Sequence, residues 1–550
     1  MSRGIADDTT RLLPAATANL KGITTDYGAV EEATEDSLTS QDREEIEQSA
    51  KEDRPKRQIG VFSAVFMIFN RIIGTGIFAT PGTILGFSGS VGLAMVMWVV
   101  GACIAAVGMH VYIIWGTALP HNGGEKNYLE HLFPRPKRLI TCLYAANAVL
   151  LAYGAGNSLV FAEYSIASIA PSLLQAPSPT PRVFLGCSSV QLVAFACLTF
   201  VVLLHGLHIP AGLRLQNTLG MLKIGILLVV VGAGVQALKG DLQEGVERPG
   251  NFDSWTKIWD GSRGGSSVLC ACLYNVIWSY VGFSNANYAL SEMHNPGRTL
   301  RIAGPLAIIT VTVFYLLCNI AYFSAASKEE ITGSGRLVAA LLFKNVWGEK
   351  TERVLNGFVA LSALGNVLSV LFSQGRVNQS LGRERVLPFS KFWASSWPAK
   401  APLAGLGLQW VTCNIVVFTL PPGDAYNFVI NVISYPLAVI NATISFGLVY
   451  LAWRASSSKT LAPPPPSSLP STFNPPLTVS LFIPALAFGF ANVFLFLAPL
   501  MKPPPGVQPY ERLPYWTHAV GGWAVFALGA VWWYISERRL RQLGRVVVVL

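Results

Sequence analysis

Long apolar segments separated by short polar stretches make up most of the chain from residue 59 onwards. At a rise of ~1.5 Å per residue, about 20 apolar residues cross the hydrocarbon core of a bilayer as one α-helix. We therefore expect an all-α integral membrane protein with about twelve transmembrane helices. The predicted spans are 59–83, 89–115, 139–170, 183–205, 215–237, 268–290, 302–325, 354–375, 402–420, 425–452, 475–499 and 515–535.

The first apolar segment is interrupted at its centre by Gly74-Thr75-Gly76. Each glycine weakens a helix by ~1 kcal/mol relative to alanine, and the backbone groups that an open helix frees cannot face lipid. We expect one half-helix to end near Ile73 and another to begin near Gly76. The carbonyls of the first and the amides of the second could bind an ammonium and a carboxylate, as in transporters with discontinuous helices. A glycine pair for close helix packing is the alternative.

The sixth span repeats this interruption five spans later. It places Gly282 among small and amide residues, and Asn285 and Asn287 would be costly against lipid. Two inverted repeats of five spans, with a site at their interface, predict this spacing. A polar packing seam is the alternative reading.

The polar segments divide the chain further. We expect a disordered cytoplasmic tail at 1–58, repeats at 59–237 and 268–452, a Pro-rich linker at 453–474, two appended helices within 475–535 and a cytoplasmic tail at 536–550. Of the 40 Lys and Arg residues, 26 then fall on the cytoplasmic side and 12 on the opposite side. This bias predicts that both termini are cytoplasmic.

Composition excludes several classes of function. With 52% hydrophobic and 13% charged residues, the chain is not a soluble globular protein. Its net charge of +10 is expected from cytoplasmic loops and requires no nucleic acid. The eight cysteines form no CxxC motif, and we find no metal-ligand cluster, P-loop or Ser/His/Asp arrangement. We therefore expect no metal, no cofactor and no enzymatic activity.

Lys223 lies in the middle of the fifth span. A bare ammonium at that depth is costly, so it should be paired, deprotonated or functional, with snorkelling to the interface as the alternative. Arg71 lies in the last turn before the first interruption, where a cation meets free carbonyls. A structural and an inner-gate role are equally compatible with its position.

Several motifs resemble the amino acid–polyamine–organocation superfamily. They are Gly74 to Phe78, Gly123-Gly124-Glu125-Lys126-Asn127-Tyr128, Gly156 to Tyr164, Ser291 to Arg298 and Gly382 to Pro388. Residues 58 to about 455 resemble the L-type amino acid transporter branch and look most like the fungal high-affinity methionine permeases.

This resemblance implies a LeuT-like fold with broken helices 1 and 6 and assigns roles to residues. The amides of Gly74, Thr75 and Gly76 would bind the α-carboxylate, and the carbonyls of Ile73 and Trp278 the amine. Val281, Gly282 and Ser284 would border the side-chain pocket. Val281 stands where mammalian members carry glycine, which narrows the pocket for aromatic substrates. The residues with these implied roles are Ile73, Gly74, Thr75, Gly76, Trp278, Val281, Gly282 and Ser284.

The resemblance also assigns Lys223 the position of a sodium ion between spans one, five and eight. We expect its ammonium to hold the carbonyls of the first break and a hydroxyl of span eight, Ser369 or Ser373. That arrangement implies no requirement for sodium and is compatible with proton coupling.

The expected function is secondary active transport of neutral L-amino acids, with methionine as the expected substrate. Alternatives are a broader neutral amino acid transporter or exchanger and an amino acid sensor. Animal L-type members are disulfide-linked to a glycoprotein through the loop after span three. Residues 172–182 contain no cysteine, so we expect no such subunit, with Cys187 as the nearest candidate. We expect the plasma membrane, with a vacuolar or lysosomal-type membrane as the alternative.

Overall fold

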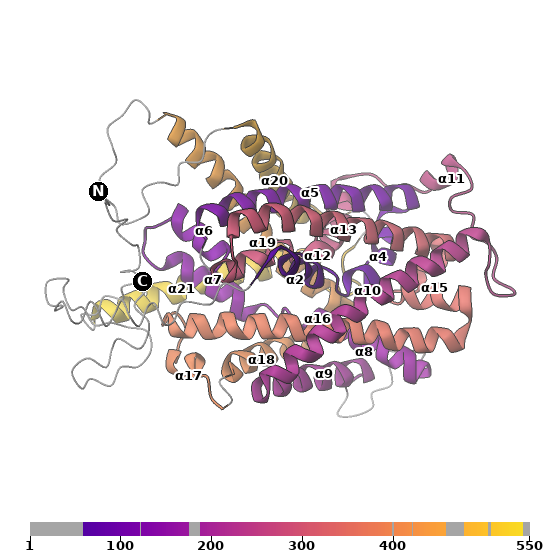
Figure 1. The fold of residues 1–550 in the computed structure, drawn as a ribbon, viewed down its shortest axis with the longest axis horizontal. Coiled ribbons are helices and arrows are strands. Elements are labelled where there is room, and N and C mark those ends of the chain that lie inside the picture. The colour runs from indigo at the N-terminus through magenta and orange to yellow at the C-terminus, as the bar shows by residue number, and fades with distance from the viewer. Residues whose placement is uncertain are drawn as a thin grey trace.

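The computed structural model describes residues 59–120, 123–174, 187–398, 401–420, 422–457, 478–503 and 508–542. These residues form a bundle of helices, most of which run along the long axis of the molecule (Figure 1). The predicted tail 1–58, the greater part of the predicted Pro-rich linker and residues 543–550 lie outside the described residues.

Within the described residues, ten helical segments are long and apolar enough to cross a membrane, and a helix pair bent by 43° can form an eleventh. The bounds are α2 Val61–Ile72 with α3 Gly76–Ala79, α5 Val91–Ala118, α7 Leu139–Leu150 with α8 Ala155–Ile169, α9 Ser189–Leu207, α10 Ile209–Lys239, α12 Ser266–Tyr280 with η5 Phe283–Glu292, α13 Pro296–Ala325, α16 Glu349–Arg383, α19 Pro422–Ser457, α20 Val479–Leu497 and α21 Thr517–Gln542.

The ninth predicted span corresponds to α18, Leu403–Thr419, a helix of 17 residues that is shorter than the others. Each of the twelve predicted spans therefore coincides with helix in the structure. The chain is a multi-pass, all-helical membrane protein, and its first and sixth spans are interrupted, as the sequence predicts. The third span is also divided, between α7 and α8.

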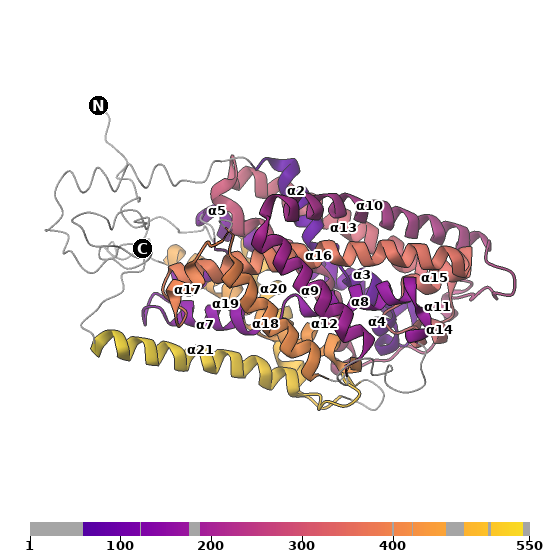
Figure 2. The same cartoon turned by 90° about the horizontal axis from the view of Figure 1, so that it is seen from below.

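Shorter helices lie in the connections and mark the two ends of the bundle. In Figures 1 and 2, α17 lies at one end and α11 and α15 at the other; we call these the α17 end and the α11 end. The short helices are α4 Pro81–Ser88, α6 Glu125–Leu132, η4 Pro171–Leu173, α11 Trp255–Trp259, α14 Lys328–Gly333, α15 Val338–Trp347, α17 Ser390–Ala394 and η7 Ala498–Leu500.

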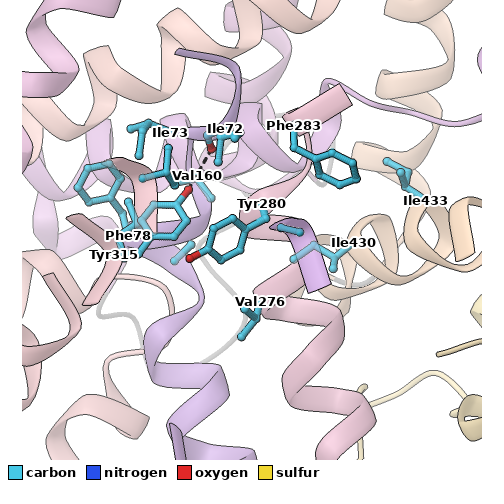
Figure 3. Packing of buried hydrophobic residues seen from close by; sticks show 14 of the residues in the cluster. Ile72, Ile73, Phe78, Val160, Val276, Tyr280, Phe283, Tyr315, Ile430 and Ile433 are labelled. Atoms are coloured by element: carbon cyan, nitrogen blue, oxygen red, sulfur yellow. Dashed lines mark hydrogen bonds between the residues drawn. The ribbon is translucent and has the colours of Figure 1, made fainter. Parts of the chain in front are cut away.

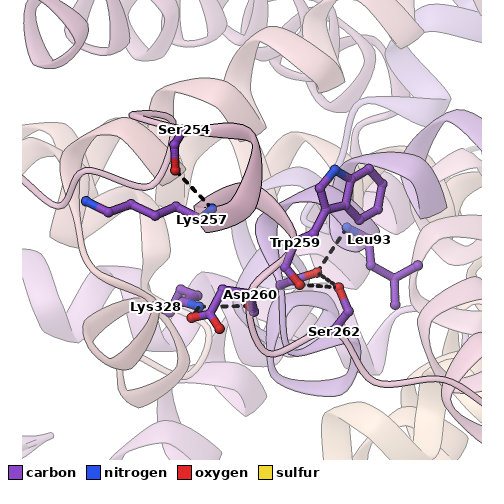
Figure 4. Close-up of polar contacts among 8 residues, drawn as sticks. Leu93, Ser254, Lys257, Trp259, Asp260, Ser262 and Lys328 are labelled. Carbon is purple, nitrogen blue, oxygen red and sulfur yellow. Dashed lines mark hydrogen bonds and ion pairs between the residues drawn. The ribbon is translucent and has the colours of Figure 1, made fainter.

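The long connection between α10 and α12 is held against other helices by polar contacts (Figure 4). The hydroxyl oxygens of Ser262 and Ser90 are 2.7 Å apart, and Ser90 also caps the start of α5. Lys328, in the first turn of α14, donates to the Asp260 carbonyl at 3.0 Å and to its carboxylate at 3.2 Å. These contacts fix the position from which α12 enters the bundle.

Buried apolar side chains surround the two interrupted helices (Figure 3). Tyr315 of α13 packs edge-on against Tyr280 and Trp98, with ring centroids 5.1 and 5.2 Å away. Ile73 is completely buried at the end of α2, and Ile72 almost so. The backbone groups freed at the breaks therefore face protein rather than lipid, as a membrane interior requires.

Candidate substrate site

The first interruption leaves three amide groups without partners. The helix α2 ends at Ile72, the backbone of Ile73 is extended, and α3 begins at Gly76. Within the described part of the chain, the N–H groups of Gly74, Thr75 and Gly76 donate no hydrogen bond. The Thr75 hydroxyl donates to the Asn157 side-chain oxygen of α8 at 2.7 Å, which anchors the segment.

The second interruption depends on one glycine. The helix α12 ends at Tyr280, and Gly282 adopts φ +122°, a conformation that side chains with a Cβ rarely adopt. A Cβ on Gly282 would also lie 2.5 Å from Cγ of Arg71. The chain therefore needs glycine here both for its backbone angle and because the two breaks lie against each other.

The glycines of the first break are equally confined. A Cβ on Gly76 would lie 2.4 Å from the Ser279 hydroxyl and 2.8 Å from its Cα, and a Cβ on Gly74 would lie 1.9 Å from Nδ2 of Asn366. The Tyr315 hydroxyl lies 3.0 Å from the Ile72 carbonyl and 2.7 Å from that of Ser279, so it bridges both broken helices (Figure 3).

A cavity of about 390 Å³ lies between these elements. Its lining residues are Arg71, Ile72, Gly74, Thr75, Gly76, Tyr153, Asn157, Trp278, Ser279, Val281, Asn366 and Val370. Five of the eight residues implied by the resemblance line it, and the other three, Ile73, Gly282 and Ser284, do not. Ser284 instead donates to the Glu125 carboxylate of α6 at 3.3 Å, because η5 turns its hydroxyl towards that helix.

Both carbonyls expected to accept from a substrate amine are already engaged. The Ile73 carbonyl accepts a hydrogen bond from Lys223 at 2.8 Å, and the Trp278 carbonyl accepts one from the Val281 N–H at 3.1 Å. Each carbonyl keeps a second lone pair. Asn366, in contrast, is buried, and its side-chain oxygen has no partner among the described residues.

Sequence reasoning missed Asn366 as well as Asn157 and Tyr153. The available signal was an amide residue in an otherwise apolar segment: Asn366 follows Gly365 in the eighth span, and Asn157 lies in one of the motifs. The pattern along a single helix cannot indicate which of its polar residues faces a break in another helix.

Lys223 is completely buried and reaches the first break as expected. Its ammonium donates to the carbonyls of Asn70, at 3.1 Å, and Ile73. The lysine approaches α16 at Gly365, and within the described residues neither Ser369 nor Ser373 is hydrogen-bonded to it. The ammonium donates two of its three N–H groups to the carbonyls at the end of α2. A coupling role for Lys223, Ser369 and Ser373 stays a prediction.

Two cations therefore lie beside the first break, Arg71 in the cavity wall and Lys223 behind it. Among the described residues, neither forms an ion pair with a carboxylate. Positive charge in a site walled by protein attracts anionic groups much more strongly than it does in water. The cavity is thus suited to a ligand that carries a carboxylate.

Polar contacts connect the second broken helix with α6 at the α17 end. The Glu125 carboxylate accepts hydrogen bonds from the hydroxyls of Tyr112, at 2.9 Å, and Tyr288. The adjacent Lys126 forms a 2.6 Å ion pair with Glu384 at the end of α16. Burial lowers the pKa of Lys126 and the Glu384 carboxylate raises it, with a net upward shift that keeps the lysine charged.

A second ion pair lies towards the α11 end. Glu163 of α8 accepts from Arg336, with Nε and Oε2 2.8 Å apart, and the guanidinium lies 5.3 Å from the centre of the Tyr426 ring of α19. The Tyr164 hydroxyl donates to the Phe78 carbonyl of α3 at 3.2 Å. The second half of the first broken helix is thereby tied to α8.

Two interrupted helices around a cavity inside a bundle of membrane-spanning helices define a protein of the secondary-transporter class. The chain belongs to the amino acid permease family, whose model matches residues 59–526. This match confirms the resemblance found in the sequence motifs. By family, the protein is a permease and not an enzyme.

Individual relatives are transporters of amino acids. The chain is 40% identical over 505 residues to the high-affinity methionine permease of Saccharomyces cerevisiae, covering 90% of this chain and 82% of the relative. It is 28% identical to the low-affinity methionine permease of the same yeast, over 88% of this chain and 84% of the relative. The human Asc-type amino acid transporter 1 is 28% identical, over 80% and 78% of the two chains.

Proposed function

We propose that this protein is a secondary active transporter of neutral L-amino acids and that methionine is its main substrate. The observation that carries the proposal is the cavity between the broken helices, where three amide N–H groups and the side-chain oxygen of Asn366 have no partner among the described residues. Donors and an acceptor within one cavity suit the carboxylate and the ammonium of an amino acid. The similarity to a high-affinity methionine permease supports the choice of substrate.

The α-carboxylate would bind the amides of Gly74, Thr75 and Gly76, with Arg71 and Lys223 adding a favourable field. The ammonium would bind the side-chain oxygen of Asn366, a residue whose amide Nδ2 would lie 1.9 Å from a Cβ on Gly74. The remaining lone pairs of the Ile73 and Trp278 carbonyls complete the set of acceptors.

The side chain of the substrate would lie near Val281 and Val370, two apolar residues of the cavity wall. An unbranched thioether suits such a wall because it is apolar and adapts its shape. Val281 at the end of α12 reduces the space for a bulky aromatic side chain.

We further propose proton coupling without sodium. The Lys223 ammonium occupies the carbonyl oxygens at the end of α2, the kind of ligands that a sodium ion would use. Loss of its proton would release these carbonyls, so the stability of this conformation of the protein would depend on the protonation of Lys223.

The contacts at the two ends of the bundle would act as gates. The Lys126–Glu384 pair would open on one side and the Glu163–Arg336 pair on the other, so that only one side is open at a time. The charge bias of the sequence would place the α17 end and both termini in the cytoplasm. We propose the plasma membrane as the site of action.

Uptake of radiolabelled amino acids into proteoliposomes tests the substrate assignment. We expect methionine to be taken up in preference to phenylalanine, lysine and glutamate. Unlabelled methionine should inhibit the uptake at a lower concentration than the other three amino acids. Flux also separates a transporter from a sensor with the same fold. Preferred uptake of a charged or aromatic amino acid, or binding without flux, would contradict the proposal.

A further inference from the structure

A second cavity, of about 510 Å³, lies where α12, α19 and α21 begin. Its walls also include the end of α4 and the connection around η7, and it shares no lining residue with the substrate cavity. Nothing in the transport scheme described above uses it.

One wall contains a buried histidine that is hydrogen-bonded to a neighbouring tyrosine. The Asn431 side-chain amide donates to the Tyr510 hydroxyl at 3.0 Å, and that hydroxyl lies 3.0 Å from Nδ1 of His518. The neutral imidazole carries a single proton, so Nε2 is a donor when Tyr510 donates to Nδ1 and an acceptor in the other tautomer.

Two residues that line the cavity, His518 and Asn275, each keep one buried polar atom without a partner among the described residues. Nε2 of His518 has no partner among the described residues, and the side chain is only 4% exposed. Asn275 of α12 is 5% exposed; its amide donates to the Ala271 carbonyl at 2.9 Å, while its side-chain oxygen has no partner in the same part of the chain. A buried polar group without a partner is costly, so a ligand that pairs with these groups is favoured.

We propose that this cavity binds a molecule with a hydroxyl group and an apolar body. A hydroxyl both donates and accepts, so it can pair with the Asn275 oxygen or with Nε2 of His518 in either tautomer. Much of the remaining wall is apolar and includes Cys270, Pro499 and Met501. A membrane sterol and a soluble long-chain alcohol are the two sources of this chemistry.

The occupant of this cavity would influence transport through α12. The Ser279 hydroxyl in the substrate cavity donates to the Asn275 carbonyl at 2.9 Å, one turn away on the same helix. A ligand that holds Asn275 thus restrains the half-helix that ends at the second break. Binding at this second cavity is separate from substrate binding and can be measured without any transport assay.

The test uses the purified full-length protein in sterol-free nanodiscs. Binding is measured for cholesterol, for its 3-methyl ether, which cannot donate a hydrogen bond, and for dodecanol, by displacement of a photoreactive cholesterol analogue. We expect saturable binding of cholesterol or dodecanol, weakened roughly tenfold by Asn275→Leu and by His518→Phe, as loss of one hydrogen bond implies.

Val520→Ala is the matched control, because Val520 lies on α21 near His518 but is exposed and does not line the cavity. We expect it to change hydroxyl binding by less than about twofold, within the range of a group that makes no contact with the ligand. Methionine binding by each variant reports whether it is folded.

Preference for cholesterol would identify the sterol as the ligand, and preference for dodecanol would identify a soluble alcohol; both support the inference. Equal binding of the methyl ether by the parent protein would overturn it, and this arm does not depend on the folding of any variant. Full binding by both cavity variants, or no saturable binding of any probe, would also overturn it.

Discussion

Gly76 determines how closely the two broken helices approach. Because even a Cβ at this position would lie 2.8 Å from the Ser279 backbone, Gly76→Leu must push the two breaks apart. We expect this variant to reach the membrane and to lose methionine uptake. Gly225→Ala is the matched control, since nothing lies within 4 Å of the Cβ it adds to α10. Normal uptake by Gly76→Leu, measured at equal surface expression, would refute the placement of the site.

Val281 lines the cavity at the end of α12, where we propose that it limits the space for the substrate side chain. Val281→Gly should admit larger aromatic substrates and weaken the binding of methionine. The expected loss is about 1–3 kcal/mol, the usual effect of one or two carbons in an apolar pocket. Val281→Ile should act in the opposite direction on aromatic substrates. Competition assays with phenylalanine and methionine measure both effects, and an unchanged ranking would show that Val281 does not border the substrate side chain.

Asn366 lines the cavity, and its side-chain oxygen, which has no partner among the described residues, is the proposed acceptor for the substrate ammonium. Asn366→Leu should raise the KM for methionine by roughly tenfold or more, because a charge-assisted hydrogen bond contributes about 1.5–3 kcal/mol. Ser362→Ala, a buried substitution on the same helix that does not line the cavity, is the control. A similar KM in the two variants would show that the substrate amine binds elsewhere.

At the scale of single residues, the positions of the two breaks could be predicted from the sequence, whereas the residues that lie opposite them could not. The two interruptions follow from Gly74, Gly76 and Gly282, since glycine in the middle of a span is locally unfavourable. Asn366 and Tyr315 become significant only through what lies opposite them on another helix, which no pattern along one segment encodes.

Among the elements, α10 acts on the first break through Lys223. Lys223→Ala should strongly reduce accumulation of methionine against a gradient, because the hydrogen bonds from α10 to the carbonyls at the end of α2 are then lost. Lys223→Arg cannot readily lose its proton, so we expect it to bind substrate and to turn over poorly. Substrate binding and uptake in proteoliposomes across an imposed pH gradient distinguish the two variants. Full pH-driven accumulation by Lys223→Ala would show that the lysine is only a structural cation.

The position of most elements could be predicted because each span is a continuous apolar segment. Two details could not. The third predicted span is two helices, α7 and α8, separated at residues 151–154, where the Gly154 Cα is packed closely against Leu371 and Cys413. The contact of Lys223 with α16 at Gly365 rather than with Ser369 or Ser373 depends on the packing distance between helices, which an apolar pattern does not give.

For the whole molecule, membership of the amino acid permease family and the helical architecture agree. The sequence predicts the number and order of spans through hydrophobicity, and the division into two inverted repeats stays a prediction from the spacing of the breaks. The second cavity could not be predicted, because its walls come from α4, α12, α19 and α21, four helices distant in the chain.

The most direct test of the account is methionine accumulation in proteoliposomes with an imposed pH gradient, acidic outside, in the absence of sodium. The account predicts accumulation above the external concentration, its collapse when a protonophore dissipates the gradient, and no stimulation by a sodium gradient. Accumulation that requires sodium, or uptake that never exceeds equilibration under the pH gradient, would contradict it.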